Sequence, residues 1–436
     1  MTRDTITAIA TPPGMGGVAI VRLSGNKALT IAEHITQKKL PPREAVFCAF
    51  MTPDNKVVDE GLAIYFKGPH SFTGEDVVEL QGHGGPVVSD QLLKLVLDSG
   101  ARMARPGEFS ERAFLNDKMD LVQAEAVADL INATTTQAAQ SAMRSLQGDF
   151  SDAINTLLEQ LVQIRMFIES AIDFTDEDID FIAEHDIIEK LKGTLEQLTV
   201  IRKTAGQGAL LQAGINVVIA GAPNAGKSSL LNCLSGKERA IVTEIAGTTR
   251  DVLREQINID GMPLHIIDTA GLRDTDHAIE QEGVKRAYAE IEKADLILWI
   301  NDVTHEAPEP FVFPQNIPVI KVQNKIDLLP SAVTSGVCIS AKHGKNIEAL
   351  KQAIKDAVGF QSAESSTFIA RRRHLDALDR TCDAIERGVR IYQQTKAHEL
   401  LAEELRQASD ALGEITGTFT TDDLLGKIFS EFCIGK

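Results

Sequence analysis

The sequence has few of the features that mark secreted, membrane-spanning or zinc-binding proteins. Its five cysteines are scattered and odd in number, and no two have a CxxC spacing, which favours a reducing compartment and argues against zinc. The first residues contain no apolar signal-peptide core, and no apolar run approaches the roughly 18 residues of a membrane span. We therefore expect a soluble, cytoplasmic protein without membrane contacts.

Positive charge is also in short supply. The 44 Lys and Arg residues stand against 62 Asp and Glu, which gives a net charge of −18. Proteins that bind a bare nucleic-acid backbone usually present a basic face. We expect any nucleic-acid contact to be local or to be supplied by a partner.

Proline is missing from two long stretches, Gly107 to Ala222 and everything after Pro330. A proline inside a helix costs ~3 kcal/mol, so proline-free stretches with helical apolar spacing are good helix candidates. The pattern predicts helices within residues 120–210 and 370–432, with a capping box at Asp120 and Gln123. At 436 residues the chain is too long for one core, so we expect several domains.

A glycine-framed loop, GAPNAGKS, follows the apolar run Ile215 to Ala220. A strand that delivers such a loop into a helix points backbone N–H groups at phosphates. Lys227 then reaches the β and γ phosphates, and the Ser228 hydroxyl binds Mg²⁺. The candidate nucleotide-binding residues of this loop are Asn224, Ala225, Gly226, Lys227, Ser228 and Ser229.

Three further motifs follow apolar runs in the order typical of GTP-binding domains: DTAG from residue 268, NKID from residue 324 and SAK from residue 340. In DTAG the carboxylate can hold the Mg²⁺ shell and the glycine N–H can sense the γ phosphate. The NKID carboxylate accepts hydrogen bonds from guanine and would repel adenine, which selects GTP. The candidate residues are Asp268, Gly271, Asn324, Lys325, Asp327, Ser340, Ala341 and Lys342.

Apolar segments place these motifs in a doubly wound α/β sheet, with a hairpin turn at Asp260 and Gly261. The predicted strands are 215–220, 256–259, 264–267, 294–300, 317–322 and 337–339. The fold class is therefore α/β, a P-loop GTPase domain inserted in an all-α domain and preceded by an α+β domain with a small sheet. The expected boundaries are 1–118 for the α+β domain, 119–213 and 361–436 for the helical domain, and 214–360 for the G domain.

Seven longer segments resemble the MnmE (TrmE) family of tRNA-modification GTPases along nearly the whole chain. They are GGVAIVRLSG at 16–25, SFTGEDVVELQGHGG at 71–85, RPGEFSERAFLNDKMDLVQAEA at 105–126, GAPNAGKSSLLN at 221–232, IAGTTRDVLRE at 245–255, IDTAGLR at 267–273 and FCIGK at 432–436.

The resemblance implies GTP hydrolysis activated by K⁺, with the G domains of a homodimer approaching each other. Leu272 stands where small GTPases place a water-orienting glutamine, and the family's glutamate matches Glu280 instead. The implied residues are Glu280, Lys227 and Asp268 for catalysis, Asn224, Thr243, Ile245 and Thr248 for K⁺, and Ser228 and Thr249 for Mg²⁺. The implied 5-formyltetrahydrofolate site comprises Arg22, Glu79, Lys118 and Lys436.

The family further implies a flavin-dependent partner, MnmG or GidA, forming a heterotetramer that modifies C5 of the wobble uridine of certain tRNAs with a carboxymethylaminomethyl-type group. Two alternatives stay open: a ribosome-assembly switch that binds rRNA, and an N-terminal one-carbon transferase that GTP only regulates. Residues 361–436 contain no GxxG of a KH-type RNA module and carry more acidic than basic side chains. The basic cluster Arg371 to Arg373 could meet tRNA, but we favour a role in anchoring the helix entry.

Overall fold

The structure is a computed structural model that describes residues 4–173, 184–222, 224–235, 254–268, 292–305, 314, 316–328, 336–361, 368–418, 422–430, 432–433 and 435. Its contacts group the chain into two compact units. Unit 1 contains Met1–Ala128, Ile154–Leu158 and Ser409–Lys436, and unit 2 contains Asp129–Ala153 and Glu159–Ala408. None of the helices in these described ranges is long and apolar enough to cross a bilayer.

Unit 1 is built on a six-stranded mixed sheet with the order β3-β4-β5-β2-β1-β6. Neighbouring strands pair antiparallel, except that β1 and β6 run parallel. The α+β prediction for this part of the chain is confirmed. The strands are β1 (Ile6–Ile9), β2 (Gly16–Ser24), β3 (Ala45–Met51), β4 (Val57–Phe66), β5 (Val77–Gly84) and β6 (Arg102–Met103).

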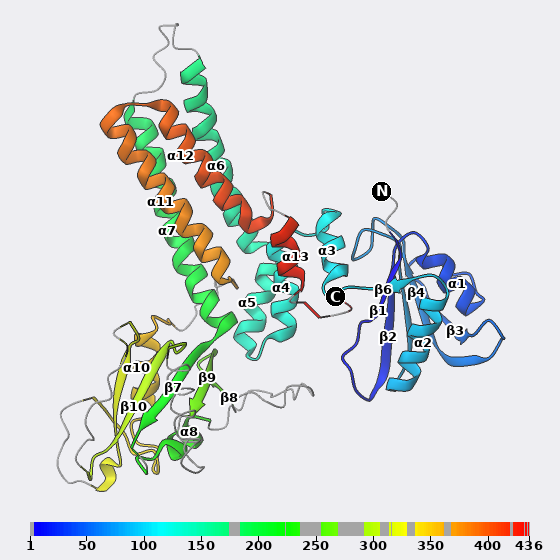
Figure 1. The fold of residues 1–436 in the computed structure, drawn as a ribbon, viewed down its shortest axis with the longest axis horizontal. Coiled ribbons are helices and arrows are strands. Elements are labelled where there is room, and N and C mark those ends of the chain that lie inside the picture. The colour runs from blue at the N-terminus through cyan, green and yellow to red at the C-terminus, as the bar shows by residue number, and fades with distance from the viewer. Residues whose placement is uncertain are drawn as a thin grey trace, which may run out of the picture. The chain divides into compact units, whose positions relative to one another are not determined.

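Helices α1 (Ala28–Thr36) and α2 (Pro86–Asp98) cover one face of this sheet (Figure 1). Because side chains alternate along a strand, the odd-numbered residues of β2 and the even-numbered residues of β5 point into that core. The buried pairs include Val21 with Leu80 and Leu23 with Val78. The intervening polar residues of β2 and β5 therefore lie on the opposite face.

The C-terminal residues complete unit 1. Helix α13 (Asp422–Ser430) packs against α3 (Glu108–Leu115), and its apolar residues share a core with the start of α4 (Leu121–Asn132). The N–H of Gly107 donates a hydrogen bond to the carbonyl of Cys433 at 3.3 Å. Segments about 300 residues apart in the sequence thus form one core.

The predicted capping box fixes the start of α4. The N–H of Gln123 donates to the Asp120 carboxylate at 2.8 Å, and the N–H of Asp120 donates to the Gln123 side chain at 3.0 Å. Two donors that a helix start leaves without partners are satisfied in this way. The capping-box prediction is confirmed.

Unit 2 contains long helices from both sides of an inserted domain, as the proline map predicts. Helix α11 packs along α7, and Gly388 of α11 leaves room for the Leu401 side chain of α12. Arg202 of α7 forms an ion pair with Asp379 of α11. The helices are α5 (Thr136–Gln147), α7 (Glu184–Ala213), α11 (Arg372–Thr395) and the unit 2 parts of α6 (Asp149–Asp173) and α12 (His398–Thr416).

The inserted domain contains a second six-stranded sheet with the order β12-β11-β10-β7-β9-β8. All neighbours are parallel except β8 and β9, which form a hairpin whose turn residues Asp260 and Gly261 have φ of 50° and 92°. Positive φ at both positions is typical of a type I′ turn. All six predicted strands are confirmed: β7 (Ile215–Gly221), β8 (Arg254–Ile259), β9 (Met262–Asp268), β10 (Leu296–Asp302), β11 (Val319–Asn324) and β12 (Val337–Cys338).

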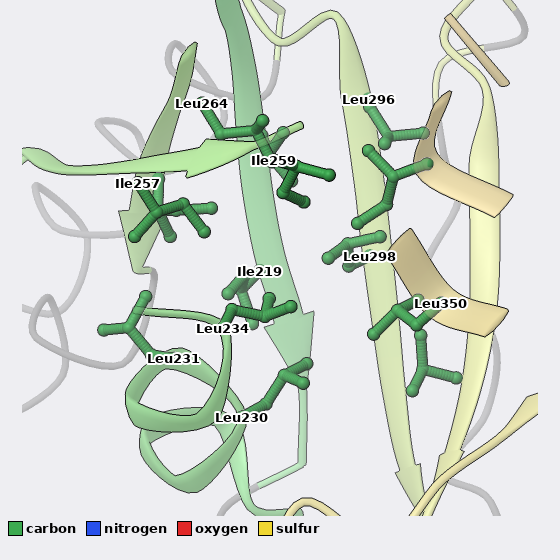
Figure 2. Close-up of a cluster of buried hydrophobic side chains, with 14 of the residues drawn as sticks. Ile219, Leu230, Leu231, Leu234, Ile257, Ile259, Leu264, Leu296, Leu298 and Leu350 are labelled. Carbon is green, nitrogen blue, oxygen red and sulfur yellow. The ribbon is translucent and has the colours of Figure 1, made fainter. Parts of the chain in front are cut away.

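Helices α8 (Lys227–Ser235) and α10 (Ile347–Ala357) pack on one face of this sheet. Figure 2 shows Leu230 and Leu234 of α8 and Leu350 of α10 pointing at strand residues such as Leu298. Val218 and Ala220 of β7 are buried in a separate cluster. A strand buried on both faces is typical of a parallel α/β sheet, which the apolar run in the sequence already indicates.

The chain returns from the G domain to the helical domain along α7. The Gln207 side chain donates to the Gly359 carbonyl and accepts from the Gln361 N–H, both at 2.8 Å. At Gly208 the returning chain is so close that a Cβ would lie 2.0 Å from the Phe368 carbonyl oxygen. Gly206, two residues earlier and therefore on the opposite face of α7, has nothing within 4 Å of the position of an added Cβ.

This contrast gives a matched pair of variants. We expect Gly208→Ala to destabilise the protein by about 2 kcal/mol or more, because the methyl group would overlap backbone that cannot move freely. Gly206→Ala should be neutral or stabilise α7 by roughly 0.5–1 kcal/mol. Thermal unfolding of both variants beside the parent protein checks this. Equal melting temperatures for the two variants would contradict the close packing of the chain at Phe368 against α7.

Candidate nucleotide-binding site

Four parallel strands end at one edge of the G-domain sheet. The register pairs Gly221 of β7 with Ile300 of β10, Asp268 of β9 with Ile219 of β7, and Asp302 with Asn324 at the ends of β10 and β11. Ligands of open α/β sheets bind outside the carboxyl ends of the strands. The sequence motifs are therefore brought to the edge where a nucleotide is expected to bind.

The loop after β7 turns tightly into α8. Asn224 has a φ of 64° and lies exposed near the loop tip, and Gly226 has a φ of 95°. A Cβ on Gly226 would lie 2.2 Å from the Asn324 side-chain nitrogen, so only glycine fits there. The loop and the NKID segment are in direct contact as a result.

Lys227 begins α8 and is mostly buried, with 9% of its surface exposed. Its ammonium donates hydrogen bonds to the carbonyls of Gly221 and Ala222, each at 3.0 Å, so it lies over the loop. Ser228 and Ser229 follow it, exposed in the first turn of the helix. The N–H groups of a first helical turn have no partners within the helix, and together with a lysine they make a site for phosphate.

Asn324 joins three motifs. Its side-chain N–H donates to the Ala225 carbonyl of the phosphate loop at 2.8 Å, and its carbonyl oxygen accepts from the Ala341 N–H of SAK at 3.0 Å. The side chain is 2% exposed. Because both ends of the amide are used, an aspartate or a leucine of similar size cannot replace it.

Asp302 lies at the same edge of the sheet and was not among the predicted site residues. Its carboxylate forms an ion pair with Lys325 at 2.5 Å and accepts from the Thr304 N–H at 2.9 Å. Burial alone would raise the pKa of Asp302, but the ion pair and the Thr304 hydrogen bonds lower it overall. The carboxylate thus stays charged and holds Lys325. An acidic residue ending the apolar run LILWIND was the signal that could have identified it.

Asp327 is the residue predicted to select the base. The Ser340 hydroxyl donates to it and lowers its pKa, with smaller contributions from the nearby His343 and Lys342 side chains. His343 lies 3.6 Å from the carboxylate. The charged carboxylate offers only acceptors, which fit the N1–H and 2-amino group of guanine.

The other predicted site residues fall in two groups. Asp268 ends β9, and the structure describes its backbone but not its side chain. Several predictions lie outside the described residues and stay predictions. They are Thr243, Ile245, Thr248, Thr249, Gly271, Glu280 and Lys436.

In unit 1 the predicted folate residues Arg22 and Glu79 face each other across β2 and β5 and form an ion pair at 2.9 Å. The Arg22 guanidinium also lies 5.7 Å from the centre of the Phe72 ring and 5.8 Å from that of Phe109. The aliphatic part of Lys118 lies against Gly74, two residues from Phe72. The structure therefore brings Arg22 and Glu79 together and places Lys118 beside the same loop.

The fold and the site define a P-loop GTP-binding domain within a larger protein. Two family models match most of the chain: "MnmE helical domain" over residues 121–433 and "GTP-binding protein TrmE N-terminus" over residues 5–118. The chain belongs to the MnmE (TrmE) family of tRNA modification GTPases.

Curated relatives match over full length. A protein of Hydrogenovibrio crunogenus named "tRNA modification GTPase MnmE" is 53% identical, covering 100% of this chain and 99% of the relative. One of the same name from Legionella pneumophila (strain Paris) is 54% identical, with 100% of both chains covered. Among solved structures, an Era variant of Aquifex aeolicus bound to GDP.AlF4- is 30% identical over 39% of this chain and 66% of that chain, with a TM-score of 0.27.

The two hydrogen bonds of the Asn324 side chain, to Ala225 and from Ala341, form what we call the Asn324 junction. Changing this residue tests the site directly. Asn324→Asp replaces a donor by an acceptor that would face the Ala225 carbonyl, which costs about 1 to 3 kcal/mol. We expect affinity for GDP to fall at least tenfold, measured by fluorescence titration with a labelled nucleotide. Asn346→Asp is the matched control, because Asn346 is exposed and its side chain donates to Cys338 in the same domain. An unchanged affinity in Asn324→Asp would show that the junction does not shape the site.

Proposed function

We propose that this chain binds and hydrolyses GTP, and that hydrolysis serves the modification of tRNA. The observation that carries the proposal is the Asn324 junction, which unites the phosphate loop, NKID and SAK with a charged Asp327 beside them. Relatives that match over the full length are named tRNA modification GTPases, which supports the second part.

The described residues supply binding and orientation. Asp327 accepts from the guanine edge, while the Ala341 N–H, predicted as a base contact, is donated to Asn324 in this structure and fixes the position of SAK. Lys227 and the N–H groups at the start of α8 stabilise the negative charge of the phosphates. The outcome is a site in which the base and the phosphates are each held by a separate strand end.

We further propose that K⁺ and Mg²⁺ assist hydrolysis. The donor set fits hard cations, because Asn224 presents an amide oxygen at the exposed loop tip and Ser228 a hydroxyl at the helix start. Bound cations would neutralise charge on the phosphoryl oxygens. The family-derived partners Thr243, Ile245 and Thr248 for K⁺, Thr249 for Mg²⁺ and Glu280 for the water belong to the same proposal, as does Asp268.

A GTPase assay in matched KCl and NaCl tests the cation role. We expect kcat to be at least tenfold higher in KCl, and Asn224→Ala to remove the difference while GTP still binds. Asn232→Ala is the control, since Asn232 is an exposed asparagine on the following helix. Equal rates in both salts would remove K⁺ and Asn224 from the mechanism and leave the GTP assignment standing.

A separate proposal concerns the folate site in unit 1. We propose that Arg22, Glu79, Lys118 and Lys436 bind 5-formyltetrahydrofolate as a one-carbon donor. Glu79 can pair with the pterin amino group and ring N–H, Arg22 or Lys118 can form ion pairs with the carboxylates, and Phe72, which is partly exposed, provides aromatic surface beside Arg22. In this proposal the homodimer works with the flavin-dependent MnmG or GidA subunit in a heterotetramer on C5 of the wobble uridine.

Reconstitution tests this part. The protein, the flavoprotein, unmodified tRNA, GTP and 5-formyltetrahydrofolate should yield the carboxymethylaminomethyl-type nucleoside, detected by mass spectrometry. Arg22→Ala should reduce the yield more than tenfold without changing the GTPase rate, because unit 2 holds the nucleotide site. Arg43→Ala is a control on the same unit, since Arg43 is exposed and bonds the His70 carbonyl. Product formed equally well without the folate would contradict the donor role.

A further inference from the structure

The β8–β9 hairpin occupies a particular place in the chain. β8 begins at Arg254, shortly after the segment that carries Thr248 and Thr249, and β9 ends at Asp268 of the DTAG motif. Because β9 runs parallel to β7, its end lies at the nucleotide edge and the turn at Asp260 and Gly261 lies at the opposite edge. The hairpin therefore connects the Thr248–Thr249 segment and the DTAG motif to a turn at the opposite edge of the sheet from the nucleotide.

The Asp260–Gly261 turn and the adjoining part of β8 contact the helical domain. The Thr135 hydroxyl, just before α5, donates a hydrogen bond to the Gly261 carbonyl at 3.0 Å. The Gln256 side chain of β8 donates to the Thr134 hydroxyl at 3.3 Å. The Gln137 side chain lies directly against Gly261. Contacts from Thr134, Thr135 and Gln137 thus connect the hairpin to the start of α5.

Thr135 serves two structures at once. Its hydroxyl oxygen accepts from the Ala138 N–H at 3.1 Å and caps α5, while its proton is donated to the hairpin tip. The residue is 7% exposed. Because one hydroxyl makes both bonds, a shift of the hairpin tip must either break a bond or move the first turn of α5.

The G domain holds the same turn from its other side. The Lys355 ammonium of α10 forms an ion pair with Asp260 at 2.6 Å, and Lys355 is 8% exposed. The turn is thus in contact with both α10 and the start of α5.

A cavity of about 180 Å³ lies beside the hairpin. Gln256 of β8 and Pro263 of β9 border it, so the space beside this part of the hairpin is not filled by packed side chains. Asp129, which lines the cavity, accepts from Arg371 at 2.8 Å and from Gln212 at 3.1 Å. It thus connects the end of α7, where the chain enters the G domain, with the N-cap of α11, where the chain has left it. The cavity lining includes Asn132, Thr134, Leu211, Gln212, Gln256 and Pro263.

We propose that the β8–β9 hairpin transmits the state of the nucleotide site to the helical domain, with Thr135 as the positioning residue that receives it. The inference rests on the proposed GTP function and specifies how that site is coupled to the rest of unit 2. Coupling between sites is reciprocal, so the helical domain also biases the affinity for nucleotide through the same contacts.

Hydrogen–deuterium exchange on the unaltered protein is the first test. Adding GDP with aluminium fluoride in KCl should change exchange at amides 135–139 at least twofold, while amides 401–408 of α12 serve as a distant reference. Calorimetry in the same buffer measures nucleotide binding. Bound nucleotide with unchanged exchange at 135–139 would overturn this inference alone, and absence of binding would overturn the proposed function with it.

Variants distinguish a loss of coupling between the nucleotide site and α5 from a general loss of protein stability. Lys355→Met and Thr135→Val should each reduce the nucleotide-induced exchange change at 135–139 at least threefold, measured at nucleotide concentrations that saturate each variant by calorimetry. Lys355→Met leaves the α5 cap intact, and Thr135→Ser should restore the response because it retains the hydroxyl. Thr204→Val, which loses only a bond within α7, is the control. A full response in both Lys355→Met and Thr135→Val would refute the role of the hairpin.

Discussion

The site depends on one buried amide. Asn324 is the place where the phosphate loop and the SAK segment meet, and it satisfies a carbonyl of one and an N–H of the other. Both partners are backbone groups, so the bonds fix main-chain positions. A buried backbone group without a partner costs about 1 to 3 kcal/mol, which makes the amide hard to replace. The arrangement of the phosphate loop relative to the base-binding residues follows from this one side chain.

Most of the architecture could be predicted from the sequence, because the physical signals are local. The six strands of the G domain follow from apolar runs ending in polar motifs, the turn from Asp260 and Gly261, and the start of α4 from Asp120 and Gln123. In unit 1 the signals are weaker, since the strands are half exposed and interrupted by glycine. There the sequence indicates a small sheet but not the order of its strands, which depends on pairing between distant segments.

The candidate site was predicted as a set of residues, not as a set of contacts. The role of Asn324 as a junction and the ion pair of Asp302 with Lys325 depend on strands that neighbour each other only in the folded sheet. Arg371 shows the same limit. Its charge is visible in the sequence, and the structure agrees with the anchoring interpretation, because its guanidinium pairs with the buried Asp129 far away in sequence.

The packing of α13 on α3 and α4 has a consequence for biosynthesis. The apolar surface of Leu121, Ala124 and Phe114 is covered by Phe429 and Phe432, which the ribosome makes about 300 residues later. At roughly 5–20 residues per second the delay is on the order of 15 to 60 s. During that time the newly made N-terminal part displays an uncovered hydrophobic patch, which is a natural target for chaperones acting on nascent chains.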